Sequence, residues 1–259
     1  MDHMLRTLGI ALLPPQRASA ANVLARCLGG RPLVQWVVRR LTDCQRLDGV
    51  IVALDGSPPQ RQLASLVPSD VPTFVCRDNG ARDPVLDALA EFPAEAVVRV
   101  RLDHVFVDPT LVDRLVTTAD AHPECDCVSY CSRSGQPAIH SPLGMFADWC
   151  RTDALRRAAA RVRTPEDRRD VCRFIYAHPE QFRLRLIPIP PQLDRDDVRL
   201  AVDSDEDWEH AQTIIDALGA DDLDWQSVAD LLDQQPALRR RMADMNRSAV
   251  GASPVGRLS

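Results

Sequence analysis

Three aspartates that directly follow apolar segments are the residues whose positions point most clearly to chemistry. Asp55 ends GVIVALD, Asp103 follows VVRVRL, and Asp203 follows VRLAV. Ligands of open parallel sheets bind beyond the carboxyl ends of the strands. Carboxylates that converge there offer the hard oxygen ligands that Mg²⁺ prefers when it also holds substrate phosphates. An aspartate in this position can equally cap the helix that follows its strand, and the residues alone leave both roles open.

Every basic side chain that could hold a phosphate is a guanidinium group. The 259 residues include 31 of the Lys and Arg types, and all of them are arginine. No lysine is therefore available as a catalyst. The formal net charge of −6 argues against nucleic acid or an anionic membrane as the main partner, because such partners select a basic face. We expect any phosphate to be held locally by arginines.

The eight cysteines indicate a reducing compartment, and we expect a cytoplasmic protein. The cluster Cys125, Cys127 and Cys131 is the candidate thiolate metal site. It lacks paired CxxC spacing, and alternation along a strand would direct part of it into the core. We interpret the cysteines as small core residues.

Apolar runs alternate with segments of helical periodicity through the first half of the chain, which is typical of a mostly parallel sheet with helices on its faces. The predicted strands are 7–13, 49–55, 73–77, 96–102 and 126–131. The predicted helices are 31–44, 58–67, 83–92 and 109–121. Pro84 and Pro109 each follow an aspartate, Asp83 and Asp108, that can cap the helix.

The second half predicts a strand at 144–150, a helix at 151–162 and a further helix that Thr164 caps. Strands at 182–189 and 198–203 and a helix at 204–219 follow. We predict an α/β domain over 1–219, a C-terminal helical extension over 220–245 and a disordered tail over 246–259. The extension would pack on its own domain or on a second copy, which leaves a homodimer open. No apolar run approaches the roughly 20 residues that span a bilayer.

The segment 96–116, AVVRVRLDHVFVDPTLVDRLV, resembles ITGDCPLIDPELIDELI of the cytidylyltransferases that make CMP-activated sugars. This family includes a spore-coat polysaccharide branch and the CMP-Kdo synthetases. Four further matches keep the family's order: GGRPLVQWVVRRL resembles GGKPLLEWVIERL, RDPVLDALAEF resembles EDDVLDRYYQA, RTPEDRRDVCRFIYAHPEQFRL resembles DREHVTPYIYENPERFRL, and RLAVDSDEDWEHAQTII resembles RLTVDTPEDLELVRAI. The resemblance covers about residues 7 to 218.

The resemblance implies a Rossmann-like, mostly parallel sheet with flanking helices, of the nucleotide-diphospho-sugar transferase type. It implies that CTP binds at the first strand–helix loop and that Asp103 and Asp203 hold Mg²⁺. A hydroxyl or carboxylate of a sugar would attack the α-phosphate of CTP and release pyrophosphate. The implied catalytic residues are Arg17, Asp103 and Asp203, and the implied nucleotide-binding residues are Gln16, Arg17, Arg26, Asp83 and Asp87.

The sequence departs from the family at the loop after the first strand. The family's QARMGSTRLPGK corresponds to PPQRASAANVLARCLGG, where Gln16 and Arg17 match but the loop is shorter and Asn22 stands at the lysine position. Phe146 replaces an acid on the sugar side, and Leu102 replaces the glycine before Asp103. Losing cations at the phosphates costs transition-state stabilisation, so these departures predict weak turnover.

Three functional hypotheses follow. The first is an active cytidylyltransferase that transfers CMP from CTP to an acidic or amino sugar for surface polysaccharide. The second is a catalytically weakened relative, a pseudoenzyme, that binds a nucleotide or nucleotide-sugar or acts as a partner subunit. The third, a glycosyltransferase-like use of the same sheet, lacks a DxD triplet at a strand end, since Asp126 stands alone in Asp-Cys-Val.

Overall fold

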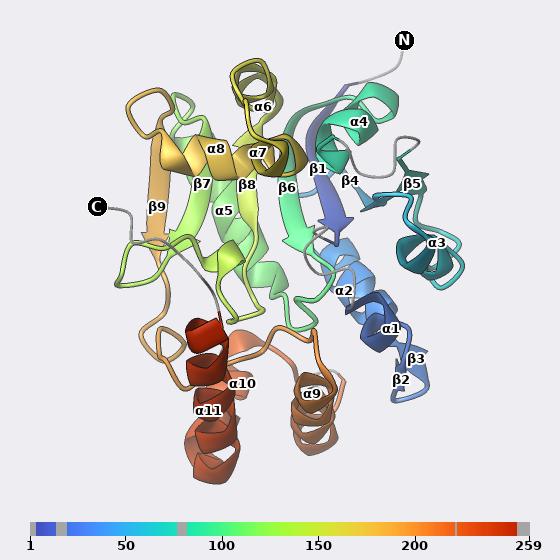
Figure 1. Cartoon of the computed structure of the whole chain (residues 1–259), viewed down its shortest axis with the longest axis vertical. Helices are drawn as coiled ribbons and strands as arrows, with labels where there is room; N and C mark the ends of the chain where they lie inside the picture. The colour runs from blue at the N-terminus through green and yellow to red at the C-terminus, as the bar shows by residue number, and fades with distance from the viewer. Residues whose placement is uncertain (1–3, 14–19, 77–81, 221, 253–259) are drawn as a thin grey trace.

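A seven-stranded sheet forms the centre of the described part of the molecule, with strand order β5-β4-β1-β6-β8-β7-β9 (Figure 1). The structure is a computed structural model that describes residues 4–13, 20–76, 82–220 and 222–252. The strands are β1 (Leu5–Leu12), β4 (Gly49–Leu54), β5 (Thr73–Val75), β6 (Ala94–Arg101), β7 (Cys127–Cys131), β8 (Asp148–Arg151) and β9 (Leu184–Pro188). Only β8 runs antiparallel to its neighbours, β6 and β7. The predicted α/β class and mostly parallel sheet are confirmed.

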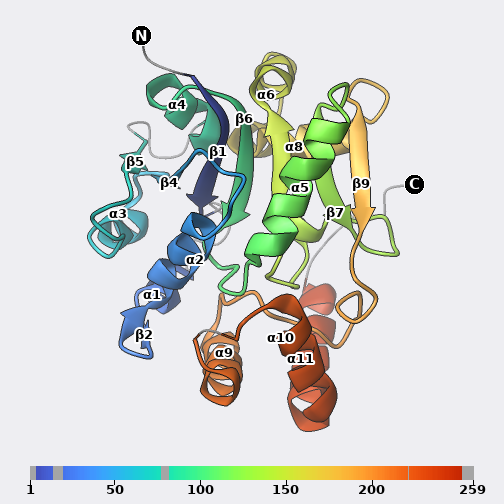
Figure 2. The same ribbon diagram turned by 180° about the vertical axis from the view of Figure 1, so that it is seen from behind.

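Helices cover both faces of the sheet. One face carries α1 (Ala20–Leu24), α2 (Leu33–Thr42), α3 (Pro58–Ala64) and α5 (Pro109–Ala121), of which α2 and α5 lie in front in Figure 2. The other face carries α4 (Pro84–Glu91), α6 (Thr152–Ala159), α7 (Pro165–Arg169) and α8 (Val171–Ala177). A short antiparallel pair, β2 (Cys27–Leu28) and β3 (Arg31–Pro32), lies between α1 and α2 in the sequence.

Strand β6 divides its side chains between the two hydrophobic cores. Val98 and Val100 pack in the core beneath α2 and α5, whereas Val97 packs in the core beneath α4, α6 and α8. Because side chains alternate along a strand, Arg99 and Arg101 project to the same face as Val97. The most hydrophobic strand therefore delivers two guanidinium groups to one side of the sheet.

Two predicted helix starts are confirmed in detail. Asp83 accepts a hydrogen bond from the backbone N–H of Val85 at the start of α4. Asp108 accepts from Thr110 and Leu111 at the start of α5. Each proline occupies the first helical turn, where its missing N–H costs nothing.

Two predicted strands are wrong in whole or in part. The segment 198–203 is not a strand, because its backbone N–H groups bond to loops: Leu200 and Ala201 donate to Pro142, and Val202 donates to Asp103. The strand predicted at 144–150 begins only at Asp148. The preceding residues form the loop that meets segment 198–203.

Three C-terminal helices lie beyond the carboxyl ends of β1 and β6, at the bottom of Figure 1. They are α9 (Asp205–Leu218), α10 (Trp225–Gln234) and α11 (Pro236–Ala252). The buried residues Val228 and Leu232 of α10, and Leu223 in the connection before it, belong to the same hydrophobic core as α2 and α5. Arg40 donates to the carbonyl of Leu223 at 2.7 Å, and the helices thus pack on their own chain.

The predicted disordered tail requires a correction. Residues 246–252 continue α11 as helix. Asn246 donates from its amide to the carbonyls of Asp196 and Val198, at 2.9 and 3.1 Å, which ties this turn to the preceding loop. Residues 253–259 lie outside the described part of the chain.

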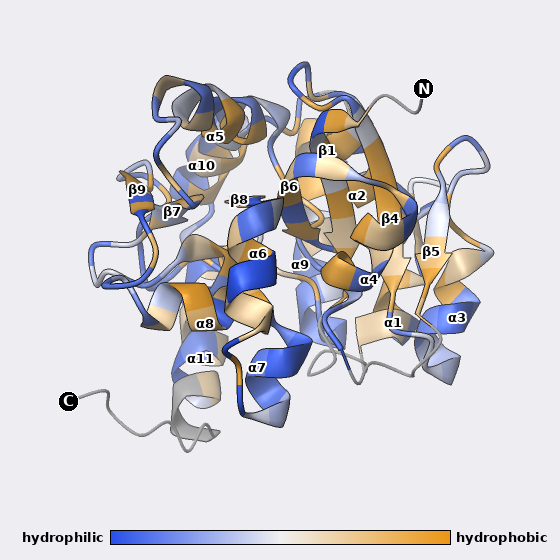
Figure 3. Cartoon of the chain, turned by 90° about the horizontal axis from the view of Figure 1, so that it is seen from above, coloured by the Kyte–Doolittle hydropathy of each residue, from blue (hydrophilic) through white to orange (hydrophobic). Residues whose placement is uncertain are grey.

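Hydrophobic residues concentrate in the strands, as Figure 3 shows for β1 and β4, while α7 is largely hydrophilic. None of the residues in α7 is buried. No helix within the described residues is long and apolar enough to cross a membrane.

Candidate functional site

A cavity of about 850 Å³ opens beyond the ends of β1 and β6. Its walls are the strand ends, the segment 134–140 and the helices α7 and α8. Its charged and aromatic lining residues are Asp83, Arg99, Arg101, His140, Asp167, Arg169, Asp170, Arg173 and Tyr176. A volume of this size accommodates a nucleotide-sized ligand.

The end of β6 carries a buried ion pair. The Arg101 guanidinium donates from Nε to Oδ1 of Asp103 at 2.9 Å and from Nη2 to Oδ2 of the same carboxylate. Its third nitrogen, Nη1, donates to the carbonyl of Ile139 at 3.0 Å. Asp103 is fully buried, and Arg101 is the member of the pair that lines the cavity.

A second buried network of ion pairs and hydrogen bonds is centred two residues earlier on β6, at Arg99. Arg99 donates to both oxygens of Asp148, at 3.0 and 2.6 Å, and to Asp170 at 2.9 Å. Tyr176 donates its hydroxyl to Asp148 at 2.6 Å. Burial raises the pKa of Tyr176 well above its usual value. For Asp170, burial acts to raise the pKa, but the net effect of its surroundings, with the charge of Arg99 foremost, is to lower it.

The four cavity arginines differ in their partners. Arg99 and Arg101 are held by carboxylates, whereas Arg169 and Arg173 are exposed and form no ion pair with any described residue. Burial lowers the pKa of His140, so this ring is neutral at pH 7. The cations open to an incoming anion are therefore Arg169 and Arg173, on α7 and α8.

The two predicted metal aspartates belong to segments that meet in space. The backbone N–H of Val202 donates to the carbonyl of Asp103 at 2.8 Å. Arg199 donates to Asp203 at 2.8 Å and also to Asp207 at 2.7 and 3.0 Å, on the first turn of α9. Each of the two aspartates thus has its own arginine.

Gly144 allows these segments to approach one another. Its φ is +63°, and a Cβ there would lie 2.1 Å from the backbone nitrogen of Ala201. No L side chain fits that space, so the loop before β8 can contact segment 198–203 only with glycine at this position.

The residues do not fit a magnesium ion as they are arranged. Both oxygens of Asp103 accept hydrogen bonds from Arg101, and Oδ1 of Asp203 accepts from Arg199. A divalent cation at Asp103 would have to compete with the guanidinium group of Arg101 for both carboxylate oxygens. We derive no chemical step through a metal here, and the Mg²⁺ site at Asp103 and Asp203 stays a prediction.

Among the nucleotide-binding residues that the sequence analysis proposes, Asp83 lines the cavity. Its carboxylate accepts from the N–H groups of Val85 and Val171, at 2.9 and 2.8 Å. Burial raises its pKa to about 6. Asp87, one turn later on α4, is half-buried and is not among the lining residues of the cavity.

Arg26 does not line the cavity. It forms an exposed ion pair with Asp205 at 2.5 Å, and its guanidinium lies 5.7 Å from the ring centroid of Trp208. Asn22, at the position of the family's lysine, is exposed on α1. Gln16 and Arg17 lie outside the described residues.

The third strand-end aspartate, Asp55, bonds to the N-cap residue of α3, Ser57, and does not itself cap the helix. It accepts from the N–H of Ser57 at 2.9 Å, just before α3. The two apolar residues that depart from the family's pattern pack in the core. Leu102 is fully buried, and Phe146 contacts Tyr130 with ring centroids 5.0 Å apart. These two replacements are compatible with the fold because each fills apolar space.

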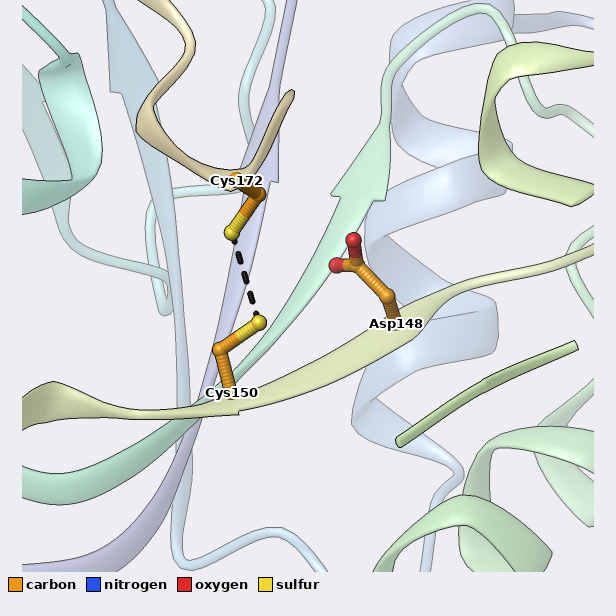
Figure 4. A group of neighbouring side chains, drawn as sticks. All are labelled: Asp148, Cys150 and Cys172. Carbon is orange, nitrogen blue, oxygen red and sulfur yellow. Dashed lines mark hydrogen bonds between the residues drawn. The ribbon is translucent and has the colours of Figure 1, made fainter. Parts of the chain in front are cut away.

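The cysteines that converge differ from the predicted patch. Among the described residues, Cys150, Cys172 and Asp148 lie close together (Figure 4), and Cys127 lies 3.1 Å from Cys150 between the sulfurs. Asp148 is already engaged by Arg99 and Tyr176. Burial raises the pKa of the Cys150 thiol well above its usual value and that of Cys172 to about 12. Without a metal, these thiols therefore hold their protons, and the carboxylate beside them is held by Arg99 and Tyr176.

Sequence reasoning missed most of the cavity wall, namely Arg99, Asp170, Arg173 and Tyr176, and it also missed Asp148, which holds Arg99. One sequence pattern could have predicted the two arginines that β6 contributes to this wall. Two arginines at alternate positions of an otherwise apolar strand, R-V-R at 99–101, must share a face. Buried arginines require carboxylate partners, and the sequence cannot name the partners of Arg99 because they come from β8 and the start of α8.

The comparisons with known proteins agree with this fold. An uncharacterised protein of Methanocaldococcus jannaschii is 22% identical over 216 residues, 82% of this chain and 84% of the relative. A cytidylyltransferase structure from Leptospira borgpetersenii superposes with a TM-score of 0.75 at 17% identity, covering 91% of this chain and 97% of that one. A CMP:2-keto-3-deoxy-manno-octonic acid synthetase complexed with CTP gives 0.57 at 11% identity, covering 82% and 99%.

At these identities the structural likeness establishes the fold, which is of the nucleotide-diphospho-sugar transferase type. The family model for the MobA-like NTP transferase domain matches residues 22–182, more than half of the chain. That stretch includes every charged residue named above on the cavity wall. The chain therefore belongs to the family of MobA-like NTP transferase domains, with a nucleotidyltransferase fold.

Proposed function

We propose that the protein binds CTP in the 850 Å³ cavity and transfers CMP to an acidic or amino sugar for surface polysaccharide. The observation that carries the proposal is the cavity itself, which lies at the carboxyl ends of β1 and β6 and is lined by four arginines. This is the edge at which open α/β sheets bind ligands. The CTP complex of the structurally similar synthetase supports the choice of nucleotide.

The two ends of the cavity suit different parts of the reaction. We propose that the triphosphate lies toward the ends of β1 and β6, where Arg101 lines the wall. The acceptor would lie toward α7 and α8, where Arg169 and Arg173 are open to an anion. Exposed arginines bind a carboxylate or phosphate by paired hydrogen bonds, which favours an acidic acceptor over an amino sugar.

The reaction needs positioning and charge neutralisation from the chain. An oxygen of the acceptor attacks the α-phosphorus, the bond to the bridging oxygen breaks, and pyrophosphate leaves. Arg101 is fixed by Asp103 and Ile139, so it faces the cavity without reorganisation. Fixed cations of this kind stabilise charge that develops on phosphate oxygens.

A second candidate function is binding without turnover. It is favoured by the engagement of both inner arginines with carboxylates, which reduces the net positive charge that the cavity offers to a triphosphate. A protein of this kind would hold a nucleotide or nucleotide-sugar, or act as a partner subunit.

We also propose a reducing, cytoplasmic location. None of the eight cysteines is in a disulfide bond. The sulfur of Cys150 lies 3.1 Å from that of Cys127 and 3.3 Å from that of Cys172, and it forms a disulfide bond with neither. Such thiols persist where the compartment keeps them reduced.

Calorimetry with CTP, and then with UTP, GTP and ATP, tests nucleotide binding. Pyrophosphate release, measured with CTP and a panel of acidic and neutral sugars, then separates the two candidates. We expect saturable CTP binding and release only with an acidic acceptor. Binding without release from any sugar would favour the second candidate, and absence of binding by every nucleotide would refute both.

A further inference from the structure

The positive charge beside Asp103, one of the two predicted metal ligands, is the guanidinium group of Arg101. Arg101 and Asp103 stand two residues apart at the end of β6 and on the same face, so the guanidinium reaches the carboxylate in a two-point contact. The side chain of Asp103 is 0% exposed and that of Arg101 is 8% exposed. The pair is therefore shielded from the solvent that weakens ion pairs at a surface.

The contacts of Arg101 hold its guanidinium group in this position. Two of its nitrogens face Asp103, and the third donates to the carbonyl of Ile139 in the cavity wall. Displacing it would leave three acceptors without their donor. A planar guanidinium with all three nitrogens bonded is held more firmly than a flexible ammonium group would be.

The position also suits a role toward the ligand. Arg101 is opposite Leu12 in the parallel register of β6 and β1, and both residues line the cavity. Leu12 ends β1, and the chain then enters the loop in which the sequence analysis places the phosphates. Arg101 is thus the buried cation at the end of the sheet where the nucleotide would bind.

We propose that Arg101 supplies, at Asp103, the positive charge that a divalent cation would otherwise supply, so that this chain binds its nucleotide without a metal at Asp103. The inference deepens the proposed function, because it specifies how the same site meets the charge of the nucleotide. The structure supports it through the two-point contact and through the burial of both partners.

Metal binding in the absence of nucleotide gives the first test. Thermal unfolding is measured with and without Mn²⁺ for the wild type, Arg101→Ala and the double variant Arg101→Ala with Asp103→Ala. We expect no change in the melting temperature of the wild type, because the carboxylate of Asp103 is already bonded to Arg101. We expect Mn²⁺ to raise the melting temperature of Arg101→Ala by about 5 °C, because Mn²⁺ replaces the positive charge that Asp103 has lost, and the double variant to lose that rise.

A matched control removes an arginine from another carboxylate. Arg157 contacts Asp126, which is also buried, at the start of β7. Arg157→Ala should show no rise with Mn²⁺, because Asp126 still accepts from the backbone N–H of Arg183, and this separates a specific site from binding to any carboxylate that loses its arginine. A Mn²⁺ shift in the wild type that Asp103→Ala removes would overturn the inference. So would a folded Arg101→Ala variant that gains no shift.

CTP binding by the wild type gives the second test and needs no variant to fold. Calorimetry is performed in EDTA and in excess Mg²⁺. We expect dissociation constants that agree within about threefold, well short of the factor of ten that 1.4 kcal/mol would produce. A loss of tenfold or more in EDTA would overturn the inference but leave the proposed function intact. Absence of CTP binding in both buffers would refute the proposed function, and the Mn²⁺ comparison would still decide the inference.

Discussion

At the scale of single residues, the same residue type performs two tasks in the cavity. Arg99 and Arg101 are buried and held by Asp148, Asp170 and Asp103. Arg169 and Arg173 are exposed on α7 and α8. Removing one partner of a buried pair leaves an uncompensated charge and costs about 3–5 kcal/mol, so substitutions at the inner pair disturb the fold. The outer pair can be substituted at little structural cost.

Arg169→Gln combined with Arg173→Gln should weaken the binding of an acidic acceptor. Each lost charge-assisted hydrogen bond removes about 1.5–3 kcal/mol, so the KM for an acidic sugar should rise tenfold or more. Arg168→Gln is the control, because Arg168 is exposed on the same helix and does not line the cavity. The acceptor KM is measured by pyrophosphate release. Equal effects of the control and the double variant would exclude a specific anion contact.

Asp83 should make stability depend on pH. Its pKa is raised by burial from 3.8 to about 6, so the native state holds its proton more tightly than the unfolded chain. The resulting stabilisation is complete below about pH 3.8 and is lost as the pH rises through about 6. Between pH 4 and 7 the wild type should lose on the order of 2–3 kcal/mol relative to Asp83→Asn. Urea unfolding at several pH values measures the difference, and a pH-independent difference would contradict the assignment.

How far single residues could be predicted depended on whether their partners were local. The caps Asp83 and Asp108 were predictable because their backbone N–H donors lie two or three residues along the chain. The sequence could not distinguish a metal-ligand role for Asp55 from a turn role, and in the structure its carboxylate accepts from the N–H of Ser57 before α3. The engagement of Asp103 by Arg101 was readable from the alternation at 99–103 but was not recognised.

At the scale of elements, the site depends on a loop contact more than on strand pairing. Segment 198–203 resembles a strand in its alternation, yet it bonds to Pro142 and Asp103. The sequence could not reveal this, because the contact depends on Gly144 in a loop more than 50 residues away. The strands and helices of the first half were predictable because each has its own apolar period.

Gly144→Ala should destabilise the fold by about 3 kcal/mol or more. The added Cβ would meet the backbone of Leu200 and Ala201 and would also stand at a φ of +63°. Gly135→Ala is the matched control, since its φ is +81° and no atom lies within 4 Å of the added carbon. The control isolates the backbone cost of about 1–2 kcal/mol. Urea denaturation measures both, and equal losses would show that the approach to Ala201 is not tight.

At the scale of the whole molecule, the C-terminal helices share the hydrophobic core of the sheet. Leu223, Val228 and Leu232 pack in the core of α2 and α5. Trp225 donates its backbone N–H to Asp108 at 2.9 Å, which joins α10 to the start of α5. The sequence left open whether these helices pack on their own domain or on a second copy, since an amphipathic pattern does not name its partner. A homodimer stays a prediction.

Leu232→Ala should lower the free energy of unfolding of the whole chain by about 2–5 kcal/mol. Leu231→Ala is the control. Leu231 is adjacent to Leu232 but is only half-buried, so its replacement should cost about 1 kcal/mol. Far-UV circular dichroism and tryptophan fluorescence should report one coincident transition. An early separate transition in the Leu232→Ala variant would mean that α10 and α11 form an independent unit.

The most direct measurement of the central claim is a crystal structure of the protein grown with CTP in the presence of EDTA. The account predicts the nucleotide in the cavity between β6, residues 134–140 and the α7–α8 wall, with Arg101 still bonded to Asp103. Nucleotide bound elsewhere, or a cavity that stays without it at saturating CTP, would contradict the account.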